Sequence, residues 1–378
     1  MRPYIITFVI AAVSSLALTP PVEWLARRIG AVAMPDERKV HTEPVAQIGG
    51  LALYAGFLIA IAARIAVDRI GHPEYPLLPA DSQLLGIVLG ATVVFAVGFA
   101  DDIVDLRPGV KFAGQCVGAI ILVAFGVQIE FVGNPFGGGL LYLGWLAIPL
   151  TLFWILGFTN TVNFMDGLDG LAAGVSAIAA STFFVFAFET GQSAAGILSA
   201  LVAGLCVGFL WHNFHPAKIF MGDSGALFLG FVLSAIAMQG VMKSIAAIAF
   251  LVPIVIMGVP IFDTAWAIVR RWRKGQKISM ADAGHIHHRL LHRGFSHRQT
   301  VLLIWVWTGL LAAGGLSLRF APNAVKVGVF VVLFALSFGM TRLMGLFEPY
   351  GGAHRVGKAG GAHEDRADAD DEGTPPGE

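Results

Sequence analysis

Long apolar runs follow one another along almost the whole of this 378-residue chain. Each is close to the roughly 20 residues that an α-helix needs to cross the hydrocarbon core of a bilayer. Hydrophobic residues make up 56% of the sequence and charged residues only 13%, and a water-soluble core could not absorb so much apolar surface. Because backbone groups in lipid must be satisfied within helices or closed barrels, the sequence predicts an all-α, polytopic membrane helix bundle.

These runs predict about eleven transmembrane helices. They cover approximately residues 4–26, 48–67, 83–100, 112–128, 141–158, 170–188, 194–211, 225–242, 246–269, 300–318 and 324–346. After Phe347 the composition changes abruptly, and Gly, Ala, Asp, Glu and Pro replace the large apolar side chains. We therefore predict a single transmembrane domain over 1–347, followed by a disordered acidic tail over 348–378.

The basic residues predict how the bundle is oriented. Loops that follow odd-numbered spans hold fifteen Lys and Arg residues, whereas the other face holds six. Because cytoplasmic loops carry the excess of positive charge, we expect the first face to be cytoplasmic and the amino terminus to lie outside. An odd number of spans then places the acidic tail in the cytoplasm. The formal net charge is zero, so no overall field attracts nucleic acid.

The carboxylates gather on the same face as the bases. Eleven of the seventeen Asp and Glu residues that precede the tail lie on or beside this face. A protein that needed only solubility would spread its charge over both faces, so the clustering indicates a functional site. A transporter would place its acids near the bilayer midplane, and an intramembrane aspartyl protease would need two Asp at matched depth. Both classes are therefore weaker alternatives to an enzyme at the membrane surface.

The first acidic cluster closes the third apolar run. It contains the adjacent pair Asp101 and Asp102, then Asp105, and Lys111 follows six residues later. Adjacent carboxylates repel each other, so their presence implies a nearby cation or a shared proton. The alternative is a solvated helix end, but that gives no reason for a doublet.

The second cluster precedes the sixth apolar run. Its polar side chains recur at every third residue: Asn160, Asn163, Asp166 and Asp169. On an α-helix, neighbouring members of such a series share a face. Gly167 and Gly170 would let the backbone approach a ligand closely. Four carbonyl-bearing side chains suit Mg²⁺ or the hydrogen-bonding edge of a nucleobase, and a capping loop is the alternative.

Two further segments lie on the predicted cytoplasmic face. Asp223 opens the eighth run within Met-Gly-Asp-Ser-Gly, where it could be a helix N-cap or a ligand-binding carboxylate. The loop after the ninth run carries His285, His287, His288 and Arg289. A zinc site is one interpretation, but only the first and third of these histidines would share a helix face and no fourth ligand follows. Imidazoles beside a guanidinium are better suited to binding phosphate oxygens. The first loop adds Lys39 and His41.

Together and in their order along the chain, the five segments resemble the polyprenyl-phosphate N-acetylhexosamine-1-phosphate transferase family, over about residues 36–295. The Arg-Lys-Val-His segment ending at His41 and the block at 285–288 look like the branch that makes undecaprenyl- or decaprenyl-diphosphate-GlcNAc. The resemblance implies transfer of GlcNAc-1-phosphate from UDP-GlcNAc to a polyprenyl phosphate, with release of UMP, to initiate a cell-envelope glycopolymer. Another UDP-N-acetylhexosamine is the alternative donor.

The resemblance also implies roles for the motif residues. Asp223 and Asn163 match positions that hold Mg²⁺, with Mn²⁺ as the alternative metal, and Asp169 matches the position that recognises uracil. The catalytic positions correspond to Asp101, Asp102 and Lys111, the last of which contacts the pyrophosphate. The other candidates for nucleotide-sugar binding are Asn160, Asp166, His285, His287, His288 and Arg289, and those for the lipid-phosphate loop are Lys39 and His41. The implied partners are UDP-GlcNAc, a polyprenyl phosphate and the bilayer, with a homodimer left open and no nucleic acid.

Overall fold

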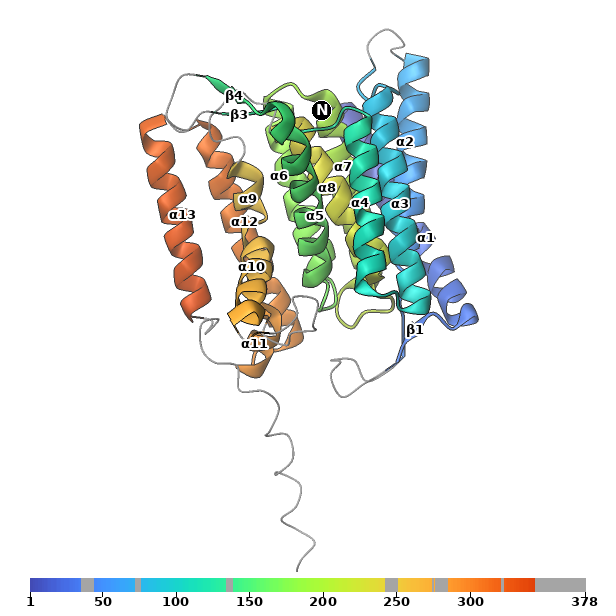
Figure 1. The fold of residues 1–378 in the computed structure, drawn as a ribbon. Coiled ribbons are helices and arrows are strands. Elements are labelled where there is room, and N and C mark those ends of the chain that lie inside the picture. Colours follow the sequence, from blue (N-terminus) through green and yellow to red (C-terminus); the bar gives the residue numbers. More distant parts are fainter. Residues whose placement is uncertain are drawn as a thin grey trace, which may run out of the picture.

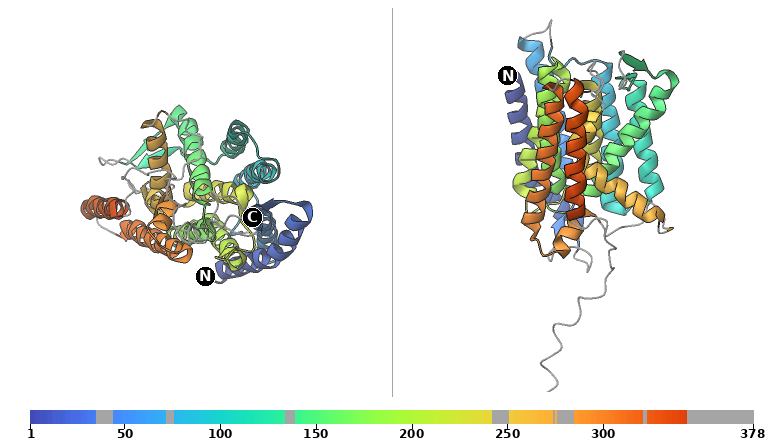
Figure 2. Two further views of the ribbon diagram at one scale, coloured as in Figure 1. Left: turned by 90° about the horizontal axis from the view of Figure 1, so that it is seen from below. Right: turned by 90° about the vertical axis from the view of Figure 1, so that its left-hand side faces the viewer.

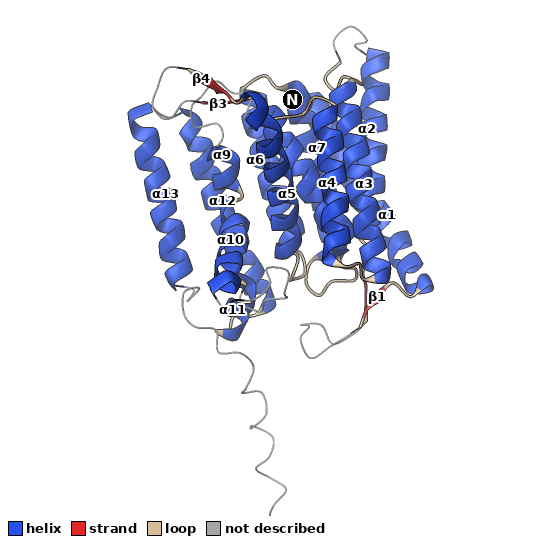
Figure 3. Cartoon of the chain, viewed as in Figure 1, coloured by secondary structure: helices blue, strands red, loops and turns tan. Residues whose placement is uncertain are grey.

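Helices make up nearly all of the secondary structure (Figure 3), as the apolar runs predict. The computed structural model describes residues 1–34, 44–71, 76–133, 139–241, 251–273, 275, 285–320 and 323–343. The predictions for Lys39, His41 and the acidic tail therefore concern residues outside the described part of the chain. The helices are α1 (Arg2–Ile29), α2 (Gly50–Gly71), α3 (Ser82–Val104), α4 (Pro108–Ala124), α5 (Ala147–Met165), α6 (Leu171–Glu189), α7 (Ser193–Asn213), α8 (Gly222–Ile236), α9 (Leu251–Ile256), α10 (Gly258–Arg273), α11 (Ile286–His292), α12 (His297–Phe320) and α13 (Asn323–Leu343).

The remaining elements are short. A 3₁₀ turn, η1 (Gly144–Leu146), precedes α5, and a π-helical segment, η2 (Ala237–Val241), continues α8. Strands β1 (Val32–Ala33) and β2 (Val45–Ala46) form one antiparallel pair, and β3 (Phe131–Gly133) and β4 (Leu140–Tyr142) form another. These strands are not predictable from the sequence, because two or three residues are too few for a periodic pattern.

The prediction of a polytopic membrane helix bundle is confirmed. Within the described residues, eight helices are long and apolar enough to cross a membrane: α1, α2, α3, η1 with α5, α6, α7, α8 with η2, and α12. Helix α4 and the segment Val331–Arg342 within α13 are shorter apolar helices at the positions of the predicted fourth and eleventh spans. Figure 2 shows these helices side by side in one bundle, with α13 and α1 on opposite sides of it.

The predicted ninth span, residues 246–269, differs from the structure. Its described part consists of the short helix α9 and the separate helix α10, with a break at Met257. Pro260 explains the break, because it has no N–H to donate to the carbonyl of Ile256. Helix α10 carries buried residues on one face and Arg270, Arg271 and Arg273 in its last turn, so it is not a uniformly apolar span.

Helix α8 forms the centre of the bundle, where it packs against α2, α3 and α5. All of its residues from Ser224 to Ile236 are buried. Its first turn is crossed closely by α3, since a Cβ atom added at Gly98 would lie 2.6 Å from the carbonyl oxygen of Asp223. Gly50 of α2 meets the same turn, where its added Cβ would lie 2.1 Å from the backbone nitrogen of Gly225. These two glycines bring the ends of three helices together at the start of α8.

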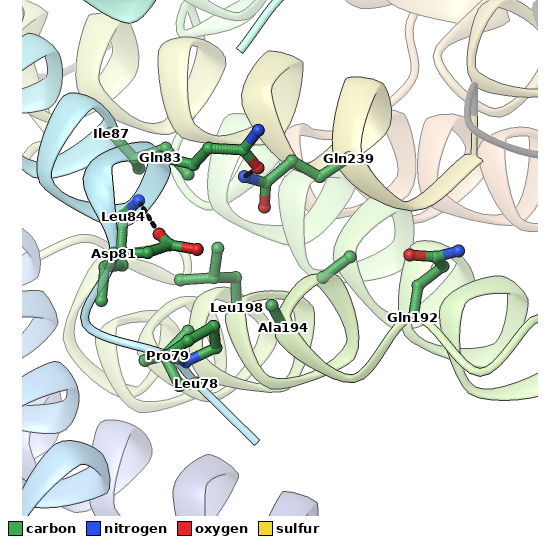
Figure 4. A pocket seen from close by; sticks show the side chains of 11 residues that line it. Leu78, Pro79, Asp81, Gln83, Leu84, Ile87, Gln192, Ala194, Leu198 and Gln239 are labelled. Atoms are coloured by element: carbon green, nitrogen blue, oxygen red, sulfur yellow. Dashed lines mark hydrogen bonds between the residues drawn. The ribbon is translucent and has the colours of Figure 1, made fainter. Parts of the chain in front are cut away.

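The two ends of the bundle differ in chemistry. The amino terminus and the β3–β4 hairpin lie at the upper end in Figure 1, whereas α3 ends and α4 begins at the lower end, near β1 and α11. A pocket at the upper end is lined by Leu78, Gln83, Leu84, Gln192, Gln239 and neighbouring residues (Figure 4). The carboxylate of Asp81 accepts the backbone N–H of Leu84 (2.9 Å), and Gln83 and Gln239 bond to each other. The described residues that line this pocket include no Lys, Arg or His, so they are poorly suited to bind a polyphosphate. Those predicted site residues that the structure describes lie at the lower end.

Candidate active site

Asp102 lies on the amino-terminal end of α8. Its Oδ1 accepts the backbone N–H of Asp223 (2.7 Å), and its Oδ2 accepts both the N–H (3.1 Å) and the hydroxyl (2.5 Å) of Ser224. The first N–H groups of a helix lack partners within the helix and carry partial positive charge, so a carboxylate from another helix stabilises them. Gly222 permits this approach, because it has a positive φ of 72° and an added Cβ would lie 2.6 Å from Oδ2 of Asp102. Asp102 therefore fixes where α8 begins.

Lys111 links the carboxylates of Asp101 and Asp223. Its Nζ donates to Oδ2 of Asp101 at 2.9 Å and also to Oδ2 of Asp223. Asp101 further accepts the backbone N–H of Leu106 at 2.8 Å, which fastens the turn between α3 and α4. The side chains of Lys111 and Asp223 are about one quarter exposed, so a ligand can reach them. Three helices thus contribute one ammonium group and two carboxylates to a single accessible cluster.

Helix α3 is longer than its apolar run. It continues to Val104, so Asp101 and Asp102 lie in its last turn, and Asp105 follows as a left-handed cap with φ 49°. The apolar run alone predicts a span that ends at residue 100. The extra turn is what carries Asp102 over the start of α8.

The second polar series does not continue along one helix. Asn160 and Asn163 lie in α5, which ends at Met165, and the chain then turns until α6 begins after Gly170 (φ 77°). The expectation of a face shared by neighbours on one continuous helix is therefore wrong beyond Asn163. Asp166 is the C-cap that follows α5, and Asp169 lies in the turn.

Asp166 is buried in the negative field of other carboxylates. Burial raises the pKa of this carboxyl well above its ordinary value, and the negative charges of Asp223, Asp102 and Asp169 raise it further. The site thus contains more carboxylates than the ammonium of Lys111 neutralises. An additional cation beside them would relieve this repulsion.

The carboxylates and amides at this end of the bundle fit the Mg²⁺ ion that the resemblance implies. Oxygen ligands from carboxylates and amides are those that Mg²⁺ prefers, and the charge around Asp166 is what a divalent cation would balance. Asp223 is partly exposed, and Asn163 lies half-buried in the last turn of α5. These two residues are therefore suitable candidates to hold Mg²⁺.

Asn160 contacts α4. Its Nδ2 donates to Oε1 of Gln115 at 2.6 Å and to the carbonyl of Leu156 at 2.8 Å. The pair joins α5 to the helix that carries Lys111. Gln115 is buried and was not singled out in the sequence, because a lone Gln in an apolar run gives no signal of its own.

Asp169 lies beside two stacked histidines and is hydrogen-bonded to one of them. Its Oδ2 pairs with Nδ1 of His215 (2.8 Å) and accepts the backbone N–H of Ala217 (3.1 Å), while Nε2 of His297 lies 3.9 Å away. Potential ligand atoms of these three side chains lie within 4.8 Å of one another, which is close enough for a metal ion. The imidazole rings, however, stack with centroids 4.0 Å and planes 14° apart, so their nitrogen lone pairs do not converge on one point. The arrangement favours a hydrogen-bonded support for Asp169 over a metal centre.

The histidine block lies against the turn that contains Asp166. His287 is buried, and a Cβ atom added at Gly167 would lie 2.4 Å from its Nε2, so the missing side chain makes room for the ring. Burial lowers the pKa of His287 well below its ordinary value, and the neighbouring histidines lower it further. The ring is therefore neutral at pH 7. The ring of His288 lies 4.4 Å from that of His287, and Arg289 is buried in α11.

His285 pairs with a carboxylate that the sequence analysis assigned no role. Oδ2 of Asp263 in α10 lies 2.9 Å from Nδ1 of His285, and Oδ1 accepts the backbone N–H of Ile286 at 3.0 Å. The sequence places Asp263 among the acids of this face, but more than twenty residues separate it from the histidine that it contacts. A local pattern could not have joined them.

Comparison with known proteins gives a consistent set of relatives. Residues 84–241 match the sequence profile of glycosyl transferase family 4. A probable undecaprenyl-phosphate N-acetylglucosaminyl 1-phosphate transferase of Bacillus subtilis is 39% identical over 334 residues, which cover 88% of this chain and 89% of that protein. A decaprenyl-phosphate N-acetylglucosaminephosphotransferase of Mycobacterium tuberculosis is 38% identical over 349 residues, 85% of each chain. An undecaprenyl-phosphate alpha-N-acetylglucosaminyl 1-phosphate transferase of Escherichia coli is 29% identical over 319 residues, 83% of each chain.

Proposed function

Because this chain belongs to glycosyl transferase family 4, among the polyprenyl-phosphate N-acetylglucosamine-1-phosphate transferases, we propose that it transfers GlcNAc-1-phosphate from UDP-GlcNAc to a polyprenyl phosphate. The proposed active site is the cluster of Asp101, Lys111 and Asp223 at the lower end of the bundle. The relatives match this chain over most of its length, and their names state both the acceptor and the transferred group. The product is a polyprenyl diphosphate sugar, the first lipid-linked unit of a cell-envelope glycopolymer, and UMP is released.

The convergence of Asp101, Lys111 and Asp223 carries this proposal. The three side chains come from α3, α4 and α8 and meet at the end of the bundle, where a water-soluble donor and a membrane-anchored acceptor can both arrive. An ammonium group held by two carboxylates has a fixed position, so it can bind the donor's pyrophosphate without reorganising. Positioning and charge neutralisation dominate phosphoryl transfer, and this arrangement supplies both.

The chemistry requires little covalent help from the protein. A phosphate oxygen of the lipid attacks the sugar-linked phosphorus of UDP-GlcNAc, the bond from this phosphorus to the bridging oxygen breaks, and UMP leaves with that oxygen. A phosphate monoester has a second pKa of about 6, so the attacking group is mostly dianionic at neutral pH and needs no strong base. Lys111 would neutralise charge on the diphosphate, and Asp101 would hold the ammonium in place.

Mg²⁺ is the proposed cofactor, held by Asp223 and Asn163, with Mn²⁺ as the alternative. Held by these two residues, a divalent cation would neutralise negative charge on the donor's diphosphate and on the leaving group. The raised pKa of Asp166 supports the proposal, because this carboxyl lies in an excess of negative charge.

The donor is proposed to lie along the turn between α5 and α6 and beneath the histidine block. Asp169, supported by His215, would accept the N3–H of uracil, since an ionised carboxylate can only accept hydrogen bonds. His285, His287, His288 and Arg289 would cover the diphosphate and the sugar. The position of these residues at one end of the bundle, opposite to the amino terminus, is consistent with an active site on the cytoplasmic face and an amino terminus outside.

The test is a reconstituted reaction. Purified protein is incubated with Mg²⁺, undecaprenyl phosphate and UDP-GlcNAc labelled in the sugar, and both the lipid fraction and the nucleotide products are analysed. The proposal predicts lipid-linked label together with UMP. UDP as the nucleotide product would indicate transfer of the sugar alone, and no product from any UDP-N-acetylhexosamine would refute the transferase. A panel of donors in the same assay identifies the sugar.

A further inference from the structure

Both carboxylate oxygens of Asp263 are bound by two consecutive residues of a different element. The residue lies in α10, is 7% exposed, and contacts Nδ1 of His285 at 2.9 Å and the backbone N–H of Ile286 at 3.0 Å. His285 is equally buried, with 7% of its surface exposed. A buried carboxylate without partners would be costly, so these contacts hold Asp263 and the start of α11 in one relative position.

The contact determines which nitrogen of His285 carries a proton. An ionised carboxylate can only accept, so Nδ1 must donate, and Nε2 is the ring nitrogen left to face a ligand. The bond to Ile286 simultaneously fixes the backbone that follows the ring. One carboxylate thus sets both the tautomer and the direction of the first histidine of the block.

The position of His285 is passed on to its neighbours by ring contacts. Its ring is parallel to that of His287, with centroids 5.8 Å and planes 5° apart, and it lies 6.4 Å from the ring of Phe164 in α5. His287 in turn occupies the space beside Gly167. A rotation of His285 would therefore disturb the layer of rings that covers the turn between α5 and α6.

We propose that Asp263 is a positioning residue of the transferase, which acts through His285 to hold the histidine block in place over the diphosphate of the nucleotide-sugar donor. This inference rests on the proposed function. Asp263 itself is not placed against the donor, so its whole effect on catalysis should depend on the histidine that it holds.

The sharpest substitution is Asp263→Asn, which keeps the volume and the burial of the side chain. An amide has one acceptor oxygen, whereas the native contacts use two. If this oxygen accepts from Ile286, the amide N–H₂ faces Nδ1 and forces the proton onto Nε2, and in the other orientation the N–H of Ile286 meets a donor. Partners that orient metal-bound histidines typically contribute about 10–100-fold, and for the same kind of contact we expect a loss of similar size in kcat/KM for UDP-GlcNAc.

A double-mutant cycle tests whether Asp263 acts through His285. UMP release is measured for wild type, Asp263→Asn, His285→Ala and the double variant, with melting temperatures in detergent for each. The inference predicts that Asp263→Asn costs less than about 3-fold in the His285→Ala background, against 10-fold or more in wild type. Asp263→Glu, which restores two acceptor oxygens, should recover part of the activity. Thr264→Ala on the same helix serves as the control and should remain within about 2-fold of wild type.

Two results would overturn the inference: wild-type kcat/KM in Asp263→Asn, or an equal loss from this substitution in both backgrounds, which would indicate a general contribution to folding. Failure of the proposed function gives a different outcome, because the wild-type protein itself would then release no UMP. A wild type that is active, with additive losses in the cycle, overturns only the role of Asp263.

Discussion

Replacement of Asp102 by Asn distinguishes a general base from a residue that positions Asp223. The structure favours the positioning role. The side chain accepts three hydrogen bonds from Asp223 and Ser224 at the start of α8. An amide of the same shape offers one acceptor oxygen, so at least one N–H group loses its partner and the favourable interaction of the charge with the helix dipole disappears. A lost bond to a charged group costs about 1.5–3 kcal/mol and the dipole interaction about 0.3–1 kcal/mol. The sum is about 2–4 kcal/mol of stability at the turn that carries Asp223.

The assay is UMP release as a function of Mg²⁺ concentration. If Asp102 positions Asp223, Asp102→Asn should raise the Mg²⁺ concentration for half-maximal rate by about 10–100-fold, as outer-shell substitutions do. The rate at saturating Mg²⁺ should then return to within about 10-fold of wild type. The melting temperature should fall together with the metal response, because both follow from the loosened start of α8.

A general base would behave differently. Loss of a base typically lowers the rate by about 10²–10⁴-fold, and added metal does not restore it. A variant with an unchanged melting temperature, an unchanged Mg²⁺ response and a rate reduced to that extent would refute the positioning role of Asp102.

Three further predictions concern the turn between α5 and α6 and the histidine block. Gly167→Ala places a Cβ 2.4 Å from Nε2 of the buried His287. We therefore expect about 1–3 kcal/mol of destabilisation in thermal unfolding, together with reduced UMP release. Gly157→Ala is the control and should be tolerated, because its Cβ meets open space. The lowered pKa of His287 means that the folded state binds a proton at this ring less readily than the unfolded chain does. Stability should therefore fall as the pH drops below about 6.5. His287→Gln should lessen that fall when the melting temperature is measured as a function of pH. An identical decline in both proteins would contradict this. Asp169→Asn removes a charged acceptor, so inhibition by UMP should weaken by about 10–100-fold while inhibition by CMP changes little, and an equal loss for both nucleotides would argue against recognition of uracil.

The fold could be predicted from the sequence where the signal is local. The length and continuity of the apolar runs are sufficient to indicate a membrane bundle, because lipid permits few backbone structures. The broken ninth span was less predictable. Its overall apolarity conceals Pro260, and a count of hydrophobic residues does not register one missing N–H group.

The site could be predicted in its components but not in its connections. Asp101, Lys111 and Asp223 were identified because each lies in a conspicuous polar segment, and the structure brings them into contact. Two of the partners that orient such residues, Gln115 and Asp263, lie on other helices and give no local signal. Their roles depend on helix crossings, such as the one at Gly98, which are set by packing over the whole bundle.

The most direct test of the account is UMP release by Asp223→Ala, with membrane-inserted protein at the wild-type level. Asp223 contacts Lys111 through its side chain and Asp102 through its backbone, so the proposed site depends on it more than on any other single residue. Asp105→Ala provides the matched control, since Asp105 is exposed and lies in the turn between α3 and α4. The account predicts that Asp223→Ala releases no UMP above background while Asp105→Ala remains active. Near-normal turnover by folded Asp223→Ala would contradict it.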